Sequence, residues 1–449
     1  MGKKIAACLM AVLLLCSSIS ALAVAPQTTS QSACVMDADT GEILYEKDAY
    51  TQLPMASITK TMTALVAMEN SDLQGSTTAT DEAMATVDPA STRIGFEAGE
   101  TLTLDELMYC MLVYSANDAA NILAAAIGGT VDNFVAMMNA KAAELGCTHT
   151  HFMNPNGLDT DGHYTCAHDM AIITRAANQY PAFAKYAGAV NYTLPADNVI
   201  GEGWQIHTKV NALEQGNAVY DARIYAGKTG WTTKAHNTFV ACAKTKDGSN
   251  VIVTLLNCPV KSGIFTETTA LLDYAENCYP KLTVSTDQLK KQAKKAVKKA
   301  GYALDEAKLQ DVTLRLPTGM TDKDLSYRCE TTDSGVQMQI AVAKDSRKAY
   351  QEETGLDGSA PLRTVLLPVV AESKADKQEQ EVQTQTETPE KQGVLASVHE
   401  KLSGLPRLAQ DAIIGASIVV CAIILMFVIL FVIRMHNLRK KRNRKNKNK

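Results

Sequence analysis

The sequence predicts an α+β domain, a smaller strand-rich module behind it, and one membrane-spanning helix near the C-terminal end. Apolar runs with helical spacing occupy residues 58–68 and 104–114. Strand-like segments at 239–244 and 250–256 flank Asp247-Gly248, which is a hairpin turn signal. Helices and an antiparallel strand pair within one stretch of chain make the predicted class of the main domain α+β.

Three short motifs carry the candidate chemistry, and each occurs once. In chain order they are Ser57-Ile58-Thr59-Lys60, Ser115-Ala116-Asn117 and Lys228-Thr229-Gly230. Each motif alone is weak, because such short patterns arise by chance, but the ordered set S-x-x-K, S-x-N and K-T-G is typical of serine acyl-transfer enzymes. The middle motif lacks the central aspartate of S-D-N, which favours the wider penicillin-recognising family over class A β-lactamases.

Ser57 is the candidate nucleophile, and a serine needs a base within hydrogen-bond reach to act as one. Pro54 and the apolar run 58–68 place Ser57 in the first turn of a buried helix, where unpaired N–H groups can hold an oxyanion. Lys60 lies three residues on, on the same helix face. Burial and a second cation, for which Lys228 is the candidate, both lower a lysine pKa and so make a base of it. The alternative is an ordinary helix N-terminus with a solvated lysine.

The other two motifs also have plain structural alternatives. Ser115-Ala116-Asn117 lies between helical runs at 104–114 and 118–127, so it reads as a turn, and its alternative role is an N-cap. Lys228-Thr229-Gly230 opens a strand region, and its alternative is an exposed strand end with a turn glycine.

Residues 28–275 resemble a D-alanyl-D-alanine carboxypeptidase, a low-molecular-mass penicillin-binding protein of the serine peptidase (SxxK acyltransferase) type. Besides the first motif, the segments that carry the resemblance are Arg93-Ile94-Gly95-Phe96 with Gly99-Glu100, Ser115-Ala116-Asn117-Asp118-Ala119-Ala120, Asn154-Pro155-Asn156-Gly157-Leu158 with His163-Tyr164, and Lys228-Thr229-Gly230-Trp231-Thr232. The resemblance implies a β-lactamase/transpeptidase-like domain over 28–280. In that fold an antiparallel sheet is flanked by helices, and a helical subdomain carries the middle motif.

The resemblance also implies a role for each motif residue. The catalytic residues would be Ser57 as the acylated nucleophile, Lys60 as its general base and Ser115 as a proton relay. The reaction would release the terminal D-alanine of a peptidoglycan stem pentapeptide in cell-wall maturation, and water would hydrolyse the acyl-enzyme. β-Lactams would mimic the D-Ala-D-Ala end as covalent inhibitors. This chemistry implies no cofactor and no metal.

The implied substrate-binding residues are Asn117, Lys228, Thr229, Gly230 and Trp231. Asn117 would hold the substrate's peptide carbonyl, while Lys228 and Thr229 would bind its terminal carboxylate. The backbone amides of Ser57 and Trp231 would form the oxyanion hole.

Both ends of the sequence indicate export and anchoring. Residues 1–23 carry two lysines, an apolar run and small residues at the end, as in a signal peptide. The 22 residues 412–433 carry no charge, which is long enough for a hydrocarbon core of about 30 Å. Nine Lys and Arg residues follow within 434–449, so that tail is predicted to be cytoplasmic and the catalytic domain extracytoplasmic, in a single-pass membrane protein. A buried core helix is the alternative for 412–433.

Charge excludes one class of partner. Of the 44 basic residues, two fall in the signal segment and nine in the tail, so 33 remain against 48 acids, a net charge of −15 between them. An ectodomain this acidic argues against nucleic acid as its partner.

Cysteine and histidine residues leave further possibilities open. Eight cysteines remain outside the two ends, and they can be free, buried or paired. Cys147-Thr148-His149-Thr150-His151 offers metal ligands at alternate strand positions, but no second ligand cluster is evident. His163 and His168 are interpreted as structural loop histidines, because a Ser/Lys site needs no imidazole.

Residues 283–370 predict a small β-rich domain, with strands at 312–316, 336–342 and 364–369. Six lysines recur on one helix face of this module: Lys290, Lys291, Lys294, Lys295, Lys298 and Lys299. They form either a solvated surface or a contact with an anionic wall polymer. Residues 371–405 are predicted to be a disordered tether, since 371–392 are almost devoid of apolar side chains.

Two other functions compete with the carboxypeptidase. A β-lactamase or transpeptidase would use the same fold, but the missing aspartate and the absence of a Glu-x-x-Leu-Asn segment argue against the lactamase. A non-catalytic penicillin sensor or wall-binding module would not need all three motifs intact.

Overall fold

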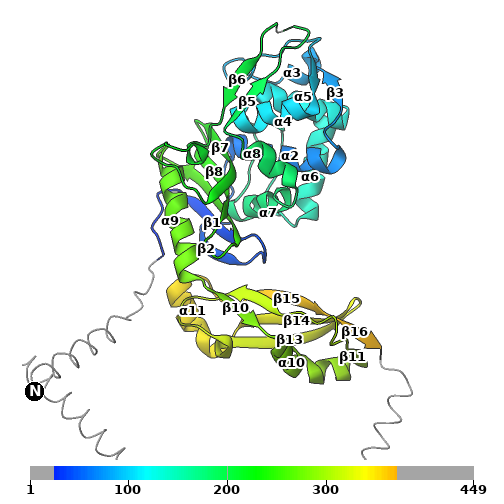
Figure 1. The fold of residues 1–449 in the computed structure, drawn as a ribbon, viewed down its shortest axis with the longest axis vertical. Coiled ribbons are helices and arrows are strands. Elements are labelled where there is room, and N and C mark those ends of the chain that lie inside the picture. Colours follow the sequence, from blue (N-terminus) through cyan, green and yellow to red (C-terminus); the bar gives the residue numbers. More distant parts are fainter. Residues whose placement is uncertain (1–24, 200, 372–449) are drawn as a thin grey trace, which may run out of the picture. The chain divides into compact units, whose positions relative to one another are not determined.

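The computed structural model describes residues 25–199 and 201–371 (Figure 1). The predicted signal peptide (1–23), transmembrane helix (412–433) and basic tail (434–449) lie outside the described residues, as does all but the first residue of the predicted tether (371–405). Among the described residues, no single helix has both the length and the apolarity to cross a membrane. Helices α5 (Asn117–Gly128) and α6 (Val131–Glu144) meet that test only as a pair, with a bend of 85°.

A five-stranded antiparallel sheet forms the centre of the main domain, in the strand order β2-β1-β9-β8-β7 (Figure 1). Its strands are β1 (Ser32–Asp37), β2 (Ile43–Lys47), β7 (Ile224–Thr232), β8 (His236–Lys244) and β9 (Asn250–Cys258). The predicted hairpin around Asp247-Gly248 is confirmed as β8 and β9. Because β1 pairs with β9, the first strand of the chain closes against the last strand of the sheet.

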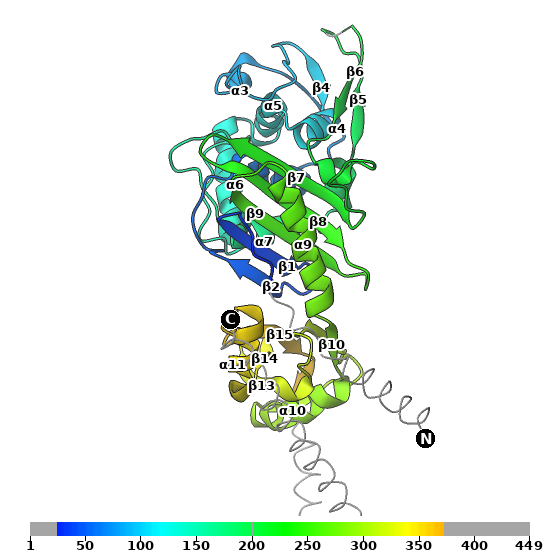
Figure 2. The ribbon, with the colours of Figure 1, turned by 90° about the vertical axis from the view of Figure 1, so that its left-hand side faces the viewer.

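Helices cover both faces of this sheet, and the pleat decides which side chains meet them. Odd-numbered residues of β8, such as Phe239 and Ala241, join an apolar cluster with α9 (Gly263–Cys278), which crosses one face (Figure 2). Even-numbered residues, such as Val240 and Cys242, join a second cluster with helices of the other face: α2 (Lys60–Asn70), α7 (Ala167–Ala177) and α8 (Pro181–Ala187). Successive side chains of a strand point to opposite faces, so both faces carry apolar residues.

A helical subdomain continues the second cluster. It contains α3 (Asp81–Met84), α4 (Leu104–Tyr109), the π-helical turn Cys110–Tyr114, α5 and α6, with the short strand pairs β3 (Ser76–Thr78) with β4 (Thr101–Thr103) and β5 (Asn191–Leu194) with β6 (Trp204–His207). Thr103 and Glu106 form a capping box that starts α4. This architecture confirms the α+β class and the helical subdomain.

The C-terminal region is β-rich, as expected. Its elements are β10 (Lys281–Val284), α10 (Thr286–Lys299), β11 (Tyr302–Leu304), β12 (Val312–Arg315), β13 (Leu325–Thr332), β14 (Gly335–Val342), α11 (Arg347–Thr354), β15 (Pro361–Leu367) and β16 (Val369–Ala371). Strands β13, β14 and β15 form one antiparallel sheet, and Leu289, Ala293 and Val297 anchor α10 in its own apolar cluster. The lysines of α10 lie on its other side, and Lys290 pairs with Glu306 at 3.0 Å. Their predicted wall contact stays a prediction.

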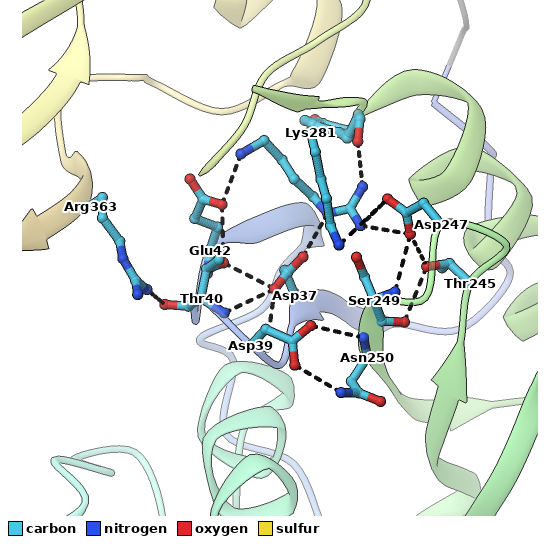
Figure 3. A network of polar contacts seen from close by, with 12 residues as sticks. Asp37, Asp39, Thr40, Glu42, Thr245, Asp247, Ser249, Asn250, Lys281 and Arg363 are labelled. Atoms are coloured by element: carbon cyan, nitrogen blue, oxygen red, sulfur yellow. Dashed lines mark hydrogen bonds and ion pairs between the residues drawn. The ribbon is translucent and has the colours of Figure 1, made fainter. Parts of the chain in front are cut away.

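A buried arginine of β12, Arg315, joins the C-terminal region to the central sheet. Figure 3 shows its acceptors Asp37, Glu42 and Asp247. The Arg315 side chain donates from Nε to Asp37 Oδ2 at 2.6 Å and from Nη2 to Asp247 Oδ2 at 3.0 Å, and its backbone N–H donates to the Glu42 carboxylate at 3.0 Å. Arg363 adds a bond to the Thr40 carbonyl at 2.6 Å. The acceptors lie at the β1–β2 and β8–β9 turns, so one cation ties two turns of the sheet to β12.

Candidate active site

The nucleophile candidate lies in a 3₁₀ turn (η1, Ala56–Thr59), and the α-helix α2 begins only at Lys60. This corrects the prediction that Ser57 lies in the first α-helical turn. Ala56 has φ +49°, a left-handed conformation that costs an L-residue about 1–2 kcal/mol. Gly157 permits the turn, because a Cβ there would lie 2.1 Å from the Ala56 carbonyl oxygen. The tight turn brings Ser57 and Lys60 into contact.

Lys60 is fully buried beneath Ser57, and its partners are all uncharged. Its Nζ lies 2.9 Å from Ser57 Oγ and 2.6 Å from Asn117 Oδ1, and it also contacts the Asn156 carbonyl oxygen. Burial holds the pKa of Lys60 well below its usual range, and repulsion from Lys228 lowers this pKa further. Asp118 has a smaller effect in the opposite direction. The two causes that the sequence suggested for a basic amine are therefore both present.

Ser115 occupies the turn between the π-helical segment and α5, as expected from its motif. Its φ of 71° is left-handed and unusual for a serine, so the surrounding structure must hold it there. This conformation places its Oγ 2.9 Å from Lys228 Nζ. Asn117 begins α5. Its side-chain Nδ2 donates to Ser91 Oγ at 2.9 Å, while its Oδ1 faces Lys60.

Lys228 lies in the interior of β7, which begins at Ile224, and not at the opening of a strand as predicted. Its side chain is buried, and Nζ also donates to the Thr229 carbonyl at 2.7 Å. Burial, with a smaller effect of Lys209, lowers the pKa of Lys228 to about 7. Burial therefore lowers the pKa of both lysines, and Lys228, with a pKa of about 7, still carries positive charge near neutral pH.

Gly230 lets β7 approach the nucleophile turn. A Cβ at Gly230 would lie 2.8 Å from the Ser57 backbone nitrogen and 2.4 Å from Thr238 Oγ1, so a side chain there is excluded. Thr238 in turn donates to the Met55 carbonyl at 2.9 Å, which fixes the turn against β8. The Ser57 amide consequently faces the strand that carries Trp231.

A cavity of about 570 Å³ opens over these groups. Ser57, Ser115, Thr229, Gly230 and Trp231 line it, together with Lys209 and Lys261 among others. Lys60 and Lys228 lie buried behind Ser57 and Ser115, and Asn117 is joined to the site through Lys60. All eight residues predicted for the site are therefore gathered at one cleft.

Several residues of the site were missed from the sequence. The Asn156 carbonyl contacts Lys60, and the Asn156 amide donates to Asn121 Oδ1 at 2.8 Å. Asp118 accepts backbone N–H bonds from Ile94, Gly95 and Phe96. The only signal was that these positions fall in segments that resemble the family, which gave them no role.

The segment 147–151, which the sequence offered as an alternative source of metal ligands, and the histidines interpreted as structural have other partners. His149 and His151 do not lie at alternate positions of a strand, although ligand atoms of His149, Cys166 and Asp169 come within 4.8 Å of one another. Asp169 already accepts from the His149 N–H and from Thr150 Oγ1, each at 2.8 Å, so it braces this loop. The eight cysteines of the described residues are free thiols, and all but Cys329 are buried. His163 lies beside the nucleophile turn, where it contacts Thr59.

Comparison with known proteins identifies the family. The family model for D-alanyl-D-alanine carboxypeptidases, Peptidase S11, matches residues 20–259. The chain is 33% identical over 257 residues to the D-alanyl-D-alanine carboxypeptidase DacF of Bacillus subtilis, covering 56% of this chain and 63% of that one. It is 37% identical over 240 residues to DacB2 of Mycobacterium tuberculosis, covering 53% and 78%. The chain thus spans less than two thirds of the length of DacF and more than two thirds of DacB2.

Solved structures agree with this assignment. A D-alanyl-D-alanine carboxypeptidase from Mycobacterium tuberculosis H37Rv superposes with a TM-score of 0.51 at 32% identity, covering 57% of this chain and 94% of that one. The Streptomyces K15 DD-transpeptidase shares the fold, with a TM-score of 0.52 at 24% identity over 56% and 98%. The resemblance predicted from the motifs is confirmed: the chain belongs to the D-alanyl-D-alanine carboxypeptidase family, Peptidase S11.

Proposed function

We propose that this protein is a serine-type D-Ala-D-Ala carboxypeptidase, which removes the terminal D-alanine from peptidoglycan stem pentapeptides and so limits their cross-linking. One observation carries the proposal. The buried Lys60 amine contacts Ser57 and two amide-type oxygens, and none of these partners is an acid. A neutral amine donates two N–H bonds to Asn117 and Asn156, which leaves its lone pair for the one partner with a proton to give, the Ser57 hydroxyl.

Acylation follows from this geometry. Lys60 takes the Ser57 proton as Oγ attacks the penultimate carbonyl carbon, and the amides of Ser57 and Trp231 stabilise the developing oxyanion. The C–N bond then breaks, and the leaving D-alanine nitrogen receives a proton from Ser115, which in turn takes the proton that Lys60 removed from Ser57. Lys60 is thus neutral again before hydrolysis. In hydrolysis, water gives a proton to Lys60 as it attacks the acyl carbon, and Lys60 returns that proton to Ser57 Oγ as the acyl bond breaks.

The cationic wall of the cleft recognises the free C-terminus of the substrate. Lys228 and Thr229 bind the terminal carboxylate, and Lys209 and Lys261 add positive charge to the same cavity. Asn117 orients the substrate's peptide carbonyl. A substrate that lacks the terminal carboxylate therefore loses binding as well as orientation.

The test measures two products in one assay. The protein is incubated with a pentapeptide ending in D-Ala-D-Ala, and free D-alanine is measured beside the retention of a labelled penicillin. Rapid D-alanine release with slow penicillin release supports the proposal, and Ser57→Ala abolishes both. Undiminished penicillin labelling of Ser57→Ala, or no D-alanine release by the parent, contradicts it.

We also propose that the protein is a single-pass membrane protein with its catalytic domain outside the cell. The support is the uncharged stretch 412–433 followed by nine basic residues without an acid. Protease added to intact protoplasts should shed a soluble penicillin-binding fragment by cutting within 371–392. An epitope placed after Lys449 should stay protected, and digestion of this epitope in sealed cells would contradict the proposed topology.

A further inference from the structure

His163 is a buried histidine beside the nucleophile, outside the set of residues assigned to the site. Its ring lies between two fixed partners. Nδ1 is 3.0 Å from the backbone nitrogen of Met153, and Nε2 is 2.9 Å from Thr59 Oγ1. Thr59 belongs to the η1 turn that carries Ser57.

The direction of each hydrogen bond in this chain can be deduced. The Met153 N–H can only donate, so Nδ1 is the accepting nitrogen and Nε2 carries the proton. Nε2–H therefore donates to Thr59 Oγ1. The Thr59 hydroxyl is then free to donate onward, and its Oγ1 lies 2.8 Å from the Ala56 carbonyl oxygen. The result is a one-way relay from Met153 through His163 and Thr59 to Ala56.

This relay ends on the peptide group that matters for catalysis. The Ala56 carbonyl and the Ser57 N–H belong to the same planar peptide, so fixing the oxygen on one side aims the N–H to the other. That peptide is held with Ala56 at φ +49°, which an alanine does not adopt without support. The Ser57 nitrogen faces Gly230 of β7, beside the strand position that supplies the second amide.

The imidazole keeps the required form at neutral pH. Burial lowers the pKa of His163 to about 4, and His151 and Lys60 act in the same direction. A second proton would occupy Nδ1 and break the bond from Met153. The neutral ring is therefore the form compatible with this packing.

We propose that His163, acting through Thr59, is a positioning residue that aims the Ser57 amide at the oxyanion formed during acylation. The inference rests on the proposed acyl transfer at Ser57. It goes beyond that function, because neither residue touches the substrate and their effect passes through the Ala56–Ser57 peptide alone.

The experiment separates binding from chemistry in the full-length protein. Acylation by a fluorescent penicillin is followed in single-turnover mode, which yields a Kd for penicillin and a rate constant for acylation. His163→Ala and Thr59→Val should each lower the rate constant by about 10- to 100-fold with little change in Kd, because a donor is misaimed and not removed. The double variant should be no slower than the slower single, as expected for two links of one relay.

Two controls make the test specific. His163→Gln keeps one acceptor for Met153 and one donor for Thr59, so it should recover the rate constant to within about threefold of the parent. His151→Ala removes a neighbouring exposed imidazole, bonded to the Gly162 carbonyl, and should leave the rate constant unchanged. Far-ultraviolet circular dichroism and a thermal melt check that each variant is folded.

Three results would overturn the relay: parental acylation rates in folded His163→Ala or Thr59→Val, a loss confined to Kd, or single effects that multiply in the double variant. If His163→Ala does not fold, Thr59→Val and His163→Gln decide between the outcomes by the same criteria. Failure of the proposed function looks different, since Ser57→Ala would then still become labelled.

Discussion

The molecule buries positive charge in two places with opposite surroundings. In the cleft, Lys60 and Lys228 contact hydroxyl, amide and carbonyl oxygens, and burial lowers both lysine pKa values. At the junction with the C-terminal region, Arg315 is equally buried but faces the carboxylates of Asp37 and Asp247. The charge of the partners, and not burial alone, distinguishes the two places. Burial without an acidic partner lowers the lysine pKa values, whereas the buried arginine is held between carboxylates as a structural clamp.

The difference also follows from the two side chains. A lysine amine loses its proton when it is desolvated, whereas a guanidinium stays charged and presents several donors in a fixed plane. The clamp also buries the carboxyl group of Glu42, which opposes its ionisation. Burial raises the pKa of Glu42 to about 8, and its Oε1 has no hydrogen-bond partner among the described residues.

The largest effect is expected when Lys60, the proposed base of the cleft, is replaced by arginine, the residue type that forms the clamp. Lys60→Arg should lower the acylation rate by about 10⁴-fold, because a guanidinium has no lone pair to take the Ser57 proton. The rate of labelling by fluorescent penicillin measures this. Lys141→Arg, at an ion pair on α6, is the matched control and should label at the parental rate. Acylation by Lys60→Arg within tenfold of the parent would remove Lys60 as the base.

Removing Arg315, the cation of the clamp, should lower the stability of the fold but leave the acylation rate unchanged. Arg315→Met leaves Asp37 buried without its partner, so the free energy of unfolding should fall by about 3–5 kcal/mol. Urea denaturation measures the loss, and the acylation rate of the folded fraction should be unchanged. Arg328→Met, which breaks an exposed pair with Glu330, should cost about 0–1 kcal/mol. Equal losses in the two variants would show that the buried network does not act as a clamp.

The second lysine of the cleft should matter less than the first. Lys228→Ala should reduce kcat/KM on a D-Ala-D-Ala peptide by about 10²-fold, since it removes both the carboxylate partner and a cation that lowers the pKa of Lys60. For a peptide with an amidated C-terminus, kcat/KM should fall by a smaller factor. Steady-state D-alanine release measures both, and a change below threefold on the two substrates would exclude Lys228 from the mechanism.

The smallest effect concerns pH at the clamp. The folded-state pKa of Glu42, about 8, lies above its unfolded value, so the folded protein holds a proton there that the unfolded chain has lost, and stability falls as pH rises from about 4.5 to 8. Glu42→Gln should remove this fall, with a gain of about 1 kcal/mol or more at pH 8 and little change near pH 5. Parallel urea curves at the two pH values measure it, and an equal shift at both would contradict the assignment.

Local signals account for what was predicted correctly. Asp247-Gly248 specifies the β8–β9 hairpin by itself, and the spacing of apolar residues located β14 and the helices of the subdomain. Strand β13 was missed because most of its side chains are at least partly exposed and polar, so it lacks an apolar pattern. The 3₁₀ turn at Ser57 was missed because its geometry depends on Gly157, about a hundred residues away.

The amino-acid sequence was enough to predict the family, because three motifs in order indicate the chemistry, and turn residues and periodicity predicted several of the main elements. The contacts among those residues depend on folding, which brings distant positions together. Lys60 meets Asn156 across 96 positions and Lys228 meets Ser115 across 113, while Arg315 meets Asp37 across 278. A sequence contains the charges but not their neighbours, and the neighbours that folding gives a buried cation decide whether its pKa is lowered or it is held between carboxylates.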